Sequence, residues 1–173
     1  MKKEDVFALL EPHAIENGFD PYLGLAIVEQ ESTYREDVAR PEQGFYHRYT
    51  MPDSLATTTE ILLASSYGLM QLMGQSLREL GYFDFFVKFY NEGKTAGRLT
   101  VSLSEVSVPK ALNALMVRPA WQVEWGCKWF KKKLAIAKGD TTKALQFWNG
   151  GGNPKYASEV LARYAKLKPL RGS

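Results

Sequence analysis

The chain has 173 residues, of which 45% are hydrophobic and 24% are charged. This length and apolar content suffice for one compact core with a cleft, so we expect a single domain over residues 1–173. No stretch approaches the roughly 18 consecutive apolar residues that a membrane span needs, so we expect no membrane insertion. The formal net charge of +3 weakly favours an anionic polymer, and charge alone does not separate nucleic acid from bacterial wall.

A few residues indicate where the protein folds and whether it binds a metal. Cys127 is the lone cysteine, so it cannot form an internal disulfide, and we expect a buried thiol. His13 and His47 lack the spacing of metal ligands, and we expect neither a metal nor a cofactor. Glu4 and Asp5 fall where a secretory signal needs an apolar run, so we expect synthesis in the cytoplasm without an export signal.

The first third of the chain predicts two helices. The pattern from Glu4 to Asn17 is amphipathic and predicts a helix that bends at Pro12 and stops at Gly18. Asp20 followed by Pro21 predicts a second helix, because the carboxylate can cap free amides and proline suits the first helical position. Residues 22–28 are apolar or small on every side, which predicts a buried helix.

Two irregular stretches follow, and we expect both to be loop insertions. Residues 39–66 carry scattered glycine, proline and threonine and predict loop with short extended pieces. Residues 91–108 include a short alternating, strand-like pattern. Either stretch could overhang a cleft. Between them, Gln75 to Leu80 predicts a helix that ends at Gly81.

The rest of the chain predicts further helices, so the fold class is mainly α with a small extended or β element. One apolar stripe of helical spacing faces the core: Val123, Cys127, Phe130, Leu134 and Ala137. A second stripe is Trp121, Trp125 and Trp129, for which core packing is favoured over sugar stacking. Breaks at Gly139 and Asp140 and at residues 150–152 precede a last helix from Pro154 to Leu167. The basic run 131–133 is interpreted as a solvated helix face.

Glu31 is an acid that continues an apolar stripe. On a helix that advances about 100° per residue, Leu23, Ile27 and Glu31 fall on nearly one line. Apolar neighbours and the negative end of the helix should raise its pKa, so that it can act as a general acid in glycoside cleavage. Glu29 is turned about 200° away and cannot face the same cleft. From periodicity alone, a plain surface acid at a helix end remains an equal alternative.

Three segments together resemble the motifs of the soluble lytic transglycosylases, relatives of goose-type lysozyme. In chain order they are "AIVEQESTY", "SSYGLMQLMGQ" and "ALQFWNGGGNPKYASEV". The resemblance implies a lysozyme-like α+β fold in which Glu31 is the single catalytic acid and base and Ser32 lies beside the site. It further implies that Gly68, Leu69, Met70 and Gln71 line a sugar-binding cleft near the small β element.

For individual residues of these motifs the resemblance implies particular contacts. Gln71 would hydrogen-bond a sugar substituent, and Met70 would pack on a sugar ring or, equally well, fill the core. Asn149 and Tyr156 match further cleft residues of the family. The chain departs from the family at Trp148, which replaces a tyrosine and can donate only through its ring nitrogen.

The resemblance also implies the reaction, the substrate and the setting. Glu31 would protonate the bond from N-acetylmuramic acid to N-acetylglucosamine, and the C6 hydroxyl of the muramic acid would then attack, giving a 1,6-anhydro end. The partner is thus the peptidoglycan glycan strand, not nucleic acid, and we expect a monomer acting on the bacterial cell wall in the periplasm. The insertion at 39–66 resembles phage-encoded members, which act as lysins or virion components.

Two alternatives to this function remain open at this point. A hydrolytic muramidase of the same fold would need a second carboxylate, and Asp37, Glu42, Asp53 and Glu60 are available in the adjoining segment. The other alternative is a wall-binding or phage-tail module with little or no activity, which the replacement at Trp148 allows.

Overall fold

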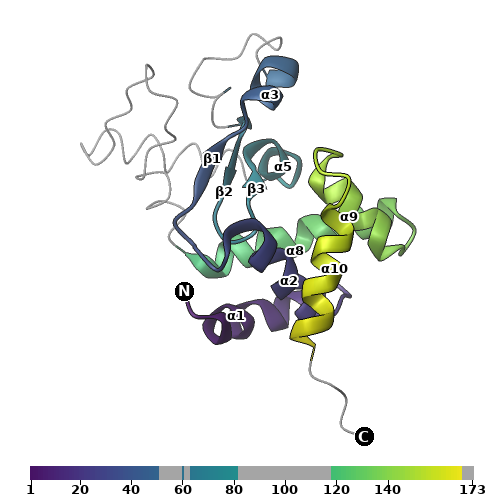
Figure 1. The fold of residues 1–173 in the computed structure, drawn as a ribbon. Coiled ribbons are helices and arrows are strands. Elements are labelled where there is room, and N and C mark those ends of the chain that lie inside the picture. The colour runs from purple at the N-terminus through teal and green to yellow at the C-terminus, as the bar shows by residue number, and fades with distance from the viewer. Residues whose placement is uncertain (51–59, 61–62, 82–117, 169–173) are drawn as a thin grey trace, which may run out of the picture.

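The computed structural model describes residues 1–50, 60, 63–81 and 118–168, and these are mostly helical with one small sheet (Figure 1). The longer helices are α1 (Lys3–Glu16), α2 (Pro21–Ser32), α8 (Pro119–Ile136), α9 (Thr141–Asn149) and α10 (Tyr156–Leu167). The shorter elements are β1 (Ala39–Pro41), α3 (Gln43–Phe45), the π-helical turn η1 (Tyr46–Thr50), β2 (Ser65–Tyr67), β3 (Leu72–Met73) and α5 (Gly74–Glu79). The predicted mainly α class with a small β element is therefore confirmed.

The helix ends follow from local chemistry in the way that the sequence predicted. The Asp20 side chain accepts a hydrogen bond from the Tyr22 amide at 2.9 Å, and Pro21 is the first residue of α2. Asp140 caps α9 in the same manner by accepting from the Lys143 amide at 3.0 Å. Gly18, just after α1, has φ of +80°, a conformation that glycine adopts without steric cost. Pro12 lies inside α1, and the bend expected there stays a prediction.

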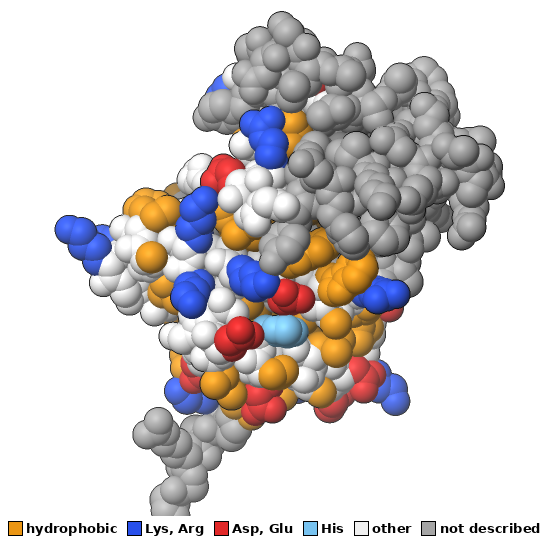
Figure 2. Space-filling view, turned by 180° about the vertical axis from the view of Figure 1, so that it is seen from behind, with side chains coloured by type: hydrophobic (Ala, Val, Ile, Leu, Met, Phe, Trp, Pro, Cys, Tyr) orange, Lys and Arg blue, Asp and Glu red, His pale blue; other side chains and the backbone are white. Residues whose placement is uncertain are grey.

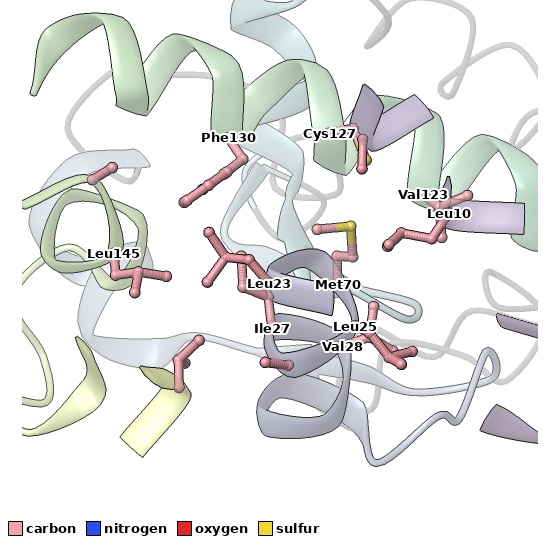
Figure 3. Close-up of a cluster of buried hydrophobic side chains, with 14 of the residues drawn as sticks. Leu10, Leu23, Leu25, Ile27, Val28, Met70, Val123, Cys127, Phe130 and Leu145 are labelled. Atoms are coloured by element: carbon pink, nitrogen blue, oxygen red, sulfur yellow. The ribbon is translucent and has the colours of Figure 1, made fainter. Parts of the chain in front are cut away.

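Helix α2 is the centre of the described fold. It packs against α1 on one side and α10 on another, while α8 packs against α1 and α9 (Figure 1). Its residues Leu25, Ile27 and Val28 are at most 2% exposed, which confirms the predicted buried helix. Figure 3 shows the core side chains that α2, α8 and α9 direct toward one another around Met70.

The predicted core stripe of α8 is confirmed, with Leu134 partly buried against the core. Val123, Cys127 and Phe130 are fully buried, and Ala137 is nearly so. In the second stripe Trp125 and Trp129 are buried, as the packing interpretation expects. Burial raises the pKa of the Cys127 thiol to about 12.

The sheet is antiparallel, with the strand order β1-β2-β3. Ala39 pairs with Tyr67, and Ser66 pairs with Met73. The segment 39–66 thus contains the expected short extended pieces, together with the short helical turns α3 and η1. Helix α5 ends before Gly81, as predicted. The predicted loop at 91–108 lies outside the described residues.

None of the helices in the described part of the chain combines the length and hydropathy that crossing a membrane requires. On the face in Figure 2, basic and acidic side chains are interspersed, with no single continuous field of one sign.

Candidate active site

Glu31 lies in the last turn of α2, where the helix stops abruptly. The next two residues after Ser32, Thr33 and Tyr34, have φ of 53° and 63°. Left-handed backbone costs a residue with a side chain about 1–2 kcal/mol, so this sharp reversal is held by the surrounding packing. The reversal ends the helix at Ser32, one residue after Glu31, whose partly buried carboxyl lies at the end of the apolar stripe that Leu23 and Ile27 begin.

Two donors from the third motif converge on one oxygen of Glu31. The indole Nε1–H of Trp148 donates to Oε1 at 2.8 Å, and the hydroxyl of Tyr156 donates to the same Oε1 at 2.6 Å. The Trp148 ring meets the fully buried Phe130 edge to face, with ring centroids 6.0 Å apart. The two donors lie 117 and 125 positions after Glu31 in the sequence, and the fold brings both to one of its atoms.

The pKa of Glu31 is raised above its ordinary value, as the sequence predicted. Burial is the largest cause and outweighs the hydrogen bonds from Tyr156 and Trp148, which lower the pKa. Among more distant charges, Arg40 lowers the pKa and Glu42 raises it. The pKa of Tyr156 is itself strongly raised, chiefly by burial and then by the charge of Glu31, so its hydroxyl keeps its proton and stays a donor.

Two charged side chains near β1 affect the pKa of Glu31. Arg40 lies in β1, and Glu42 directly follows it. Arg40 Nε donates to Glu42 Oε1 at 3.0 Å, and the Ser66 hydroxyl lies 3.2 Å from the same oxygen. The side chains of Arg40 and Glu42 are 58% and 37% exposed, so the pair is accessible to a ligand. Periodicity gave no signal for these residues, because short irregular strands do not define a face.

The block 68–71 is built into the protein interior. Leu69 and Met70 are fully buried, and Met70 packs so closely on α8 that a side chain at Gly126 would overlap it. This burial favours the core interpretation of Met70. Gly68 has φ of +70° and faces Gln122, whose Oε1 accepts from the Leu69 amide at 2.7 Å. Gln122 was not identified from the sequence.

Gln71 uses its side-chain amide within the protein. Nε2 donates to the backbone oxygens of Val38 and Gly68 at 3.0 and 2.9 Å, and Oε1 lies 3.1 Å from the Ser66 hydroxyl. With 7% of its surface exposed, Gln71 ties the β1–β2 region to the motif turn. A hydrogen bond from Gln71 to a sugar stays a prediction.

Ser32 and Asn149, the other two predicted site residues, also have partners inside the chain. The Ser32 hydroxyl donates to the Val28 oxygen at 3.2 Å and is 2% exposed, so it completes the end of α2. Asn149 Nδ2 donates to the Asn153 oxygen at 3.2 Å and closes the glycine loop between α9 and α10.

Hydrogen bonds between α2 and α10 fix Glu31 relative to Tyr156. Gln30 Nε2 donates to Glu159 at 3.1 Å, and Arg163 Nε donates to Gln30 Oε1 at 2.7 Å. Asn153 donates to the same Glu159 oxygen at 3.0 Å, which links the glycine loop to both helices. Because Gln30 directly precedes Glu31, this network holds the acid and the tyrosine that donates to it in one frame.

The described residues form no cluster of three or more histidine, cysteine, aspartate or glutamate side chains that could hold a metal. A cavity of about 470 Å³ lies at the other end of α2, lined by residues such as Phe19, Asp20 and Tyr164. It is separate from the Glu31 site.

Comparisons of the chain with protein-family models, curated proteins and solved structures gave no significant match. The assignment of function therefore rests on the sequence motifs and on the arrangement around Glu31.

Proposed function

We propose that the chain is a peptidoglycan lytic transglycosylase with a lysozyme-like fold, in which Glu31 is the single catalytic acid and base. The observation that carries the proposal is the convergence of Trp148 and Tyr156 on a partly buried carboxyl whose pKa is raised. A glutamate whose pKa burial raises, beside donors that stabilise its anion, meets both requirements of a residue that gives and then retakes one proton.

In the first step Glu31 gives its proton to the oxygen that links N-acetylmuramic acid to N-acetylglucosamine. The bond from that oxygen to the anomeric carbon breaks, and the acetamido group of the substrate stabilises the positive charge. In the second step the C6 hydroxyl of the muramic acid attacks the anomeric carbon while the Glu31 carboxylate takes its proton. The enzyme is restored, and the product carries a 1,6-anhydro ring without the addition of water.

The proposal is tested by clearing of purified peptidoglycan with Glu31→Gln. The amide keeps an oxygen that can accept from Trp148 and Tyr156 but cannot give up a proton at neutral pH. We expect clearing to fall at least a hundredfold, in keeping with the contribution of a general acid of about 10²–10⁴. The matched control is Glu29→Gln on the same helix. The Glu29 side chain pairs with Arg163 at 3.3 Å, so this variant should keep most of the activity.

Three results of this test lead to different conclusions. Loss of clearing in Glu31→Gln with activity in Glu29→Gln supports the proposal. Equal clearing by wild type and Glu31→Gln contradicts it. If neither clears the wall while both sediment with it, the chain is a wall-binding module.

Hydrolysis is the second candidate function. It is favoured by a second carboxylate, that of Glu42, whose charge acts on Glu31. Four acids were available as a second carboxylate, of which Asp53 lies outside the described residues. Of the three described ones, Glu42 is the acid whose charge raises the pKa of Glu31. Glu60 is 6% exposed and lies 3.4 Å from the Tyr46 hydroxyl, so it is engaged elsewhere. If Glu42 directs a water to the anomeric carbon, the products carry reducing muramic ends, and Glu42→Gln loses them.

A further inference from the structure

The hydrogen bonds to Glu31 make its two carboxyl oxygens unequal. Both donors reach Oε1, whereas no hydrogen bond to Oε2 comes from the described residues 1–50, 60, 63–81 and 118–168. An indole N–H can only donate, so Trp148 favours the form of the acid in which Oε1 is the carbonyl oxygen, the better acceptor of the two. A tyrosine at position 148 would impose no such preference, because a hydroxyl can donate or accept.

We propose that Oε2 is the oxygen of Glu31 that carries and transfers the catalytic proton, and that Trp148 is the positioning residue that enforces this choice. The inference rests on the proposed function for the reaction itself, but it makes a claim about the free protein. With Trp148 and Tyr156 both donating, the lone pairs of Oε1 are occupied. A proton that binds Glu31 therefore goes to Oε2, and Oε1 is the carbonyl oxygen of the acid.

This assignment determines how charge moves in the reaction. When the Oε2–H bond breaks and the proton joins the glycosidic oxygen, the negative charge spreads over both carboxyl oxygens. The two donors already in place on Oε1 stabilise that charge without rearrangement. Oε2 stays free to take the proton of the C6 hydroxyl as the new bond to the anomeric carbon forms, which returns Glu31 to its starting state.

The packing around Trp148 suits this positioning role. The ring lies against Phe130, which is fully buried, so the N–H direction is set by the core of the protein. Tyr156 is 4% exposed and begins α10, which is tied to α2 through Gln30 and Glu159. Both donors are therefore fixed in position before a substrate binds.

The infrared absorption of the protonated Glu31 carboxyl tests the proposal directly. The difference between acidic and alkaline spectra of wild type, minus that of Glu31→Gln, isolates its C=O stretch. A carbonyl that accepts two hydrogen bonds absorbs at a lower frequency than a free one. We expect Trp148→Phe and Tyr156→Phe each to raise the frequency, and the double variant to raise it further. The control is Tyr164→Phe on the same helix. The Tyr164 hydroxyl donates to Asp20 and not to Glu31, so this variant should leave the C=O frequency unchanged.

A C=O stretch that does not move in Trp148→Phe or Tyr156→Phe would place the proton on Oε1 and overturn the proposal. Should Trp148→Phe fail to fold, Tyr156→Phe supplies the same comparison, because it removes the other donor to Oε1. In activity, we expect Trp148→Phe to lower kcat about ten- to a hundredfold with little change in KM, since the lost bond stabilises a charge that develops during the reaction. A change confined to KM would contradict a positioning role.

The infrared measurement needs no substrate, which separates the two proposals. If peptidoglycan is not cleaved but the frequency shifts are seen, the proposed function fails and the assignment of the proton to Oε2 stands. If the wall is cleaved but the frequency is fixed, the assignment fails alone.

Discussion

Replacing Gly68 with alanine should destabilise the protein through two separable effects. The first is backbone strain, because Gly68 has φ of +70°, and left-handed backbone costs alanine about 1–2 kcal/mol. The second is steric, because a Cβ at position 68 would overlap Oε1 of Gln122. That oxygen accepts from the buried Leu69 amide at 2.7 Å. An amide left without its acceptor costs about 1–3 kcal/mol, so we expect a total near 3 kcal/mol.

The free energy of unfolding, measured by urea denaturation at neutral pH, tests this expectation. Gly18→Ala is the matched control, since Gly18 has φ of +80° and open space around its Cβ position, and it should cost only the strain, about 1 kcal/mol. In a Gln122→Ala background Gly68→Ala should likewise cost only the strain. The reasoning is refuted if Gly68→Ala costs no more than Gly18→Ala, or if its cost is the same with and without Gln122.

Three further outcomes are expected. Met70→Ala should lower stability by about 2–5 kcal/mol in the same urea assay while kcat changes little, as befits a core residue. Native Cys127 should not react with a thiol reagent at pH 8 and should react once the chain unfolds, because burial raises its pKa to about 12. Asp20→Ala should lower the melting temperature through the lost cap, worth about 1 kcal/mol. Burial raises the pKa of Asp20, but hydrogen bonds from Tyr164 and Lys168 lower it more, so the deficit is full near neutral pH and shrinks as pH falls through that lowered pKa.

Local features of the fold could be predicted from the sequence because local chemistry determines them. The Asp20 and Pro21 pair starts α2 through one side-chain bond and one fixed φ. The apolar stripe of α8 is buried because helical spacing directs Val123 and Phe130 to one face. Helix ends differ by one or two residues, as at α10, which begins at Tyr156 and not at Pro154.

The arrangement of the candidate site could be predicted only in part. Periodicity singled out Glu31. Nothing local to Glu31 indicates that Trp148 and Tyr156, 117 and 125 positions later, donate to one of its oxygens. Only the resemblance of the third motif connected Trp148 and Tyr156 with the glutamate.

In the motif block 68–71, the sequence did not indicate the contacts that the side chains make within the protein. The resemblance implied a cleft lining, which stays a prediction, and it gave no sign of the positive φ at Gly68 and Gln71 or of the hydrogen bonds within the protein at this turn. The Gln71 side chain donates hydrogen bonds to the backbone oxygens of Val38 and Gly68. The Gln122 side chain accepts one from the Leu69 amide. Such pairings depend on tertiary contacts across the sheet and α8, which a single sequence does not display.

The most direct test of Glu31 as a lone acid and base is mass spectrometry of the fragments that the wild type releases from purified peptidoglycan. We predict muropeptides with 1,6-anhydro ends, lighter by one water than the hydrolysed forms, and none from Glu31→Gln. Fragments that carry only reducing muramic ends, or release that persists in Glu31→Gln, would contradict that role.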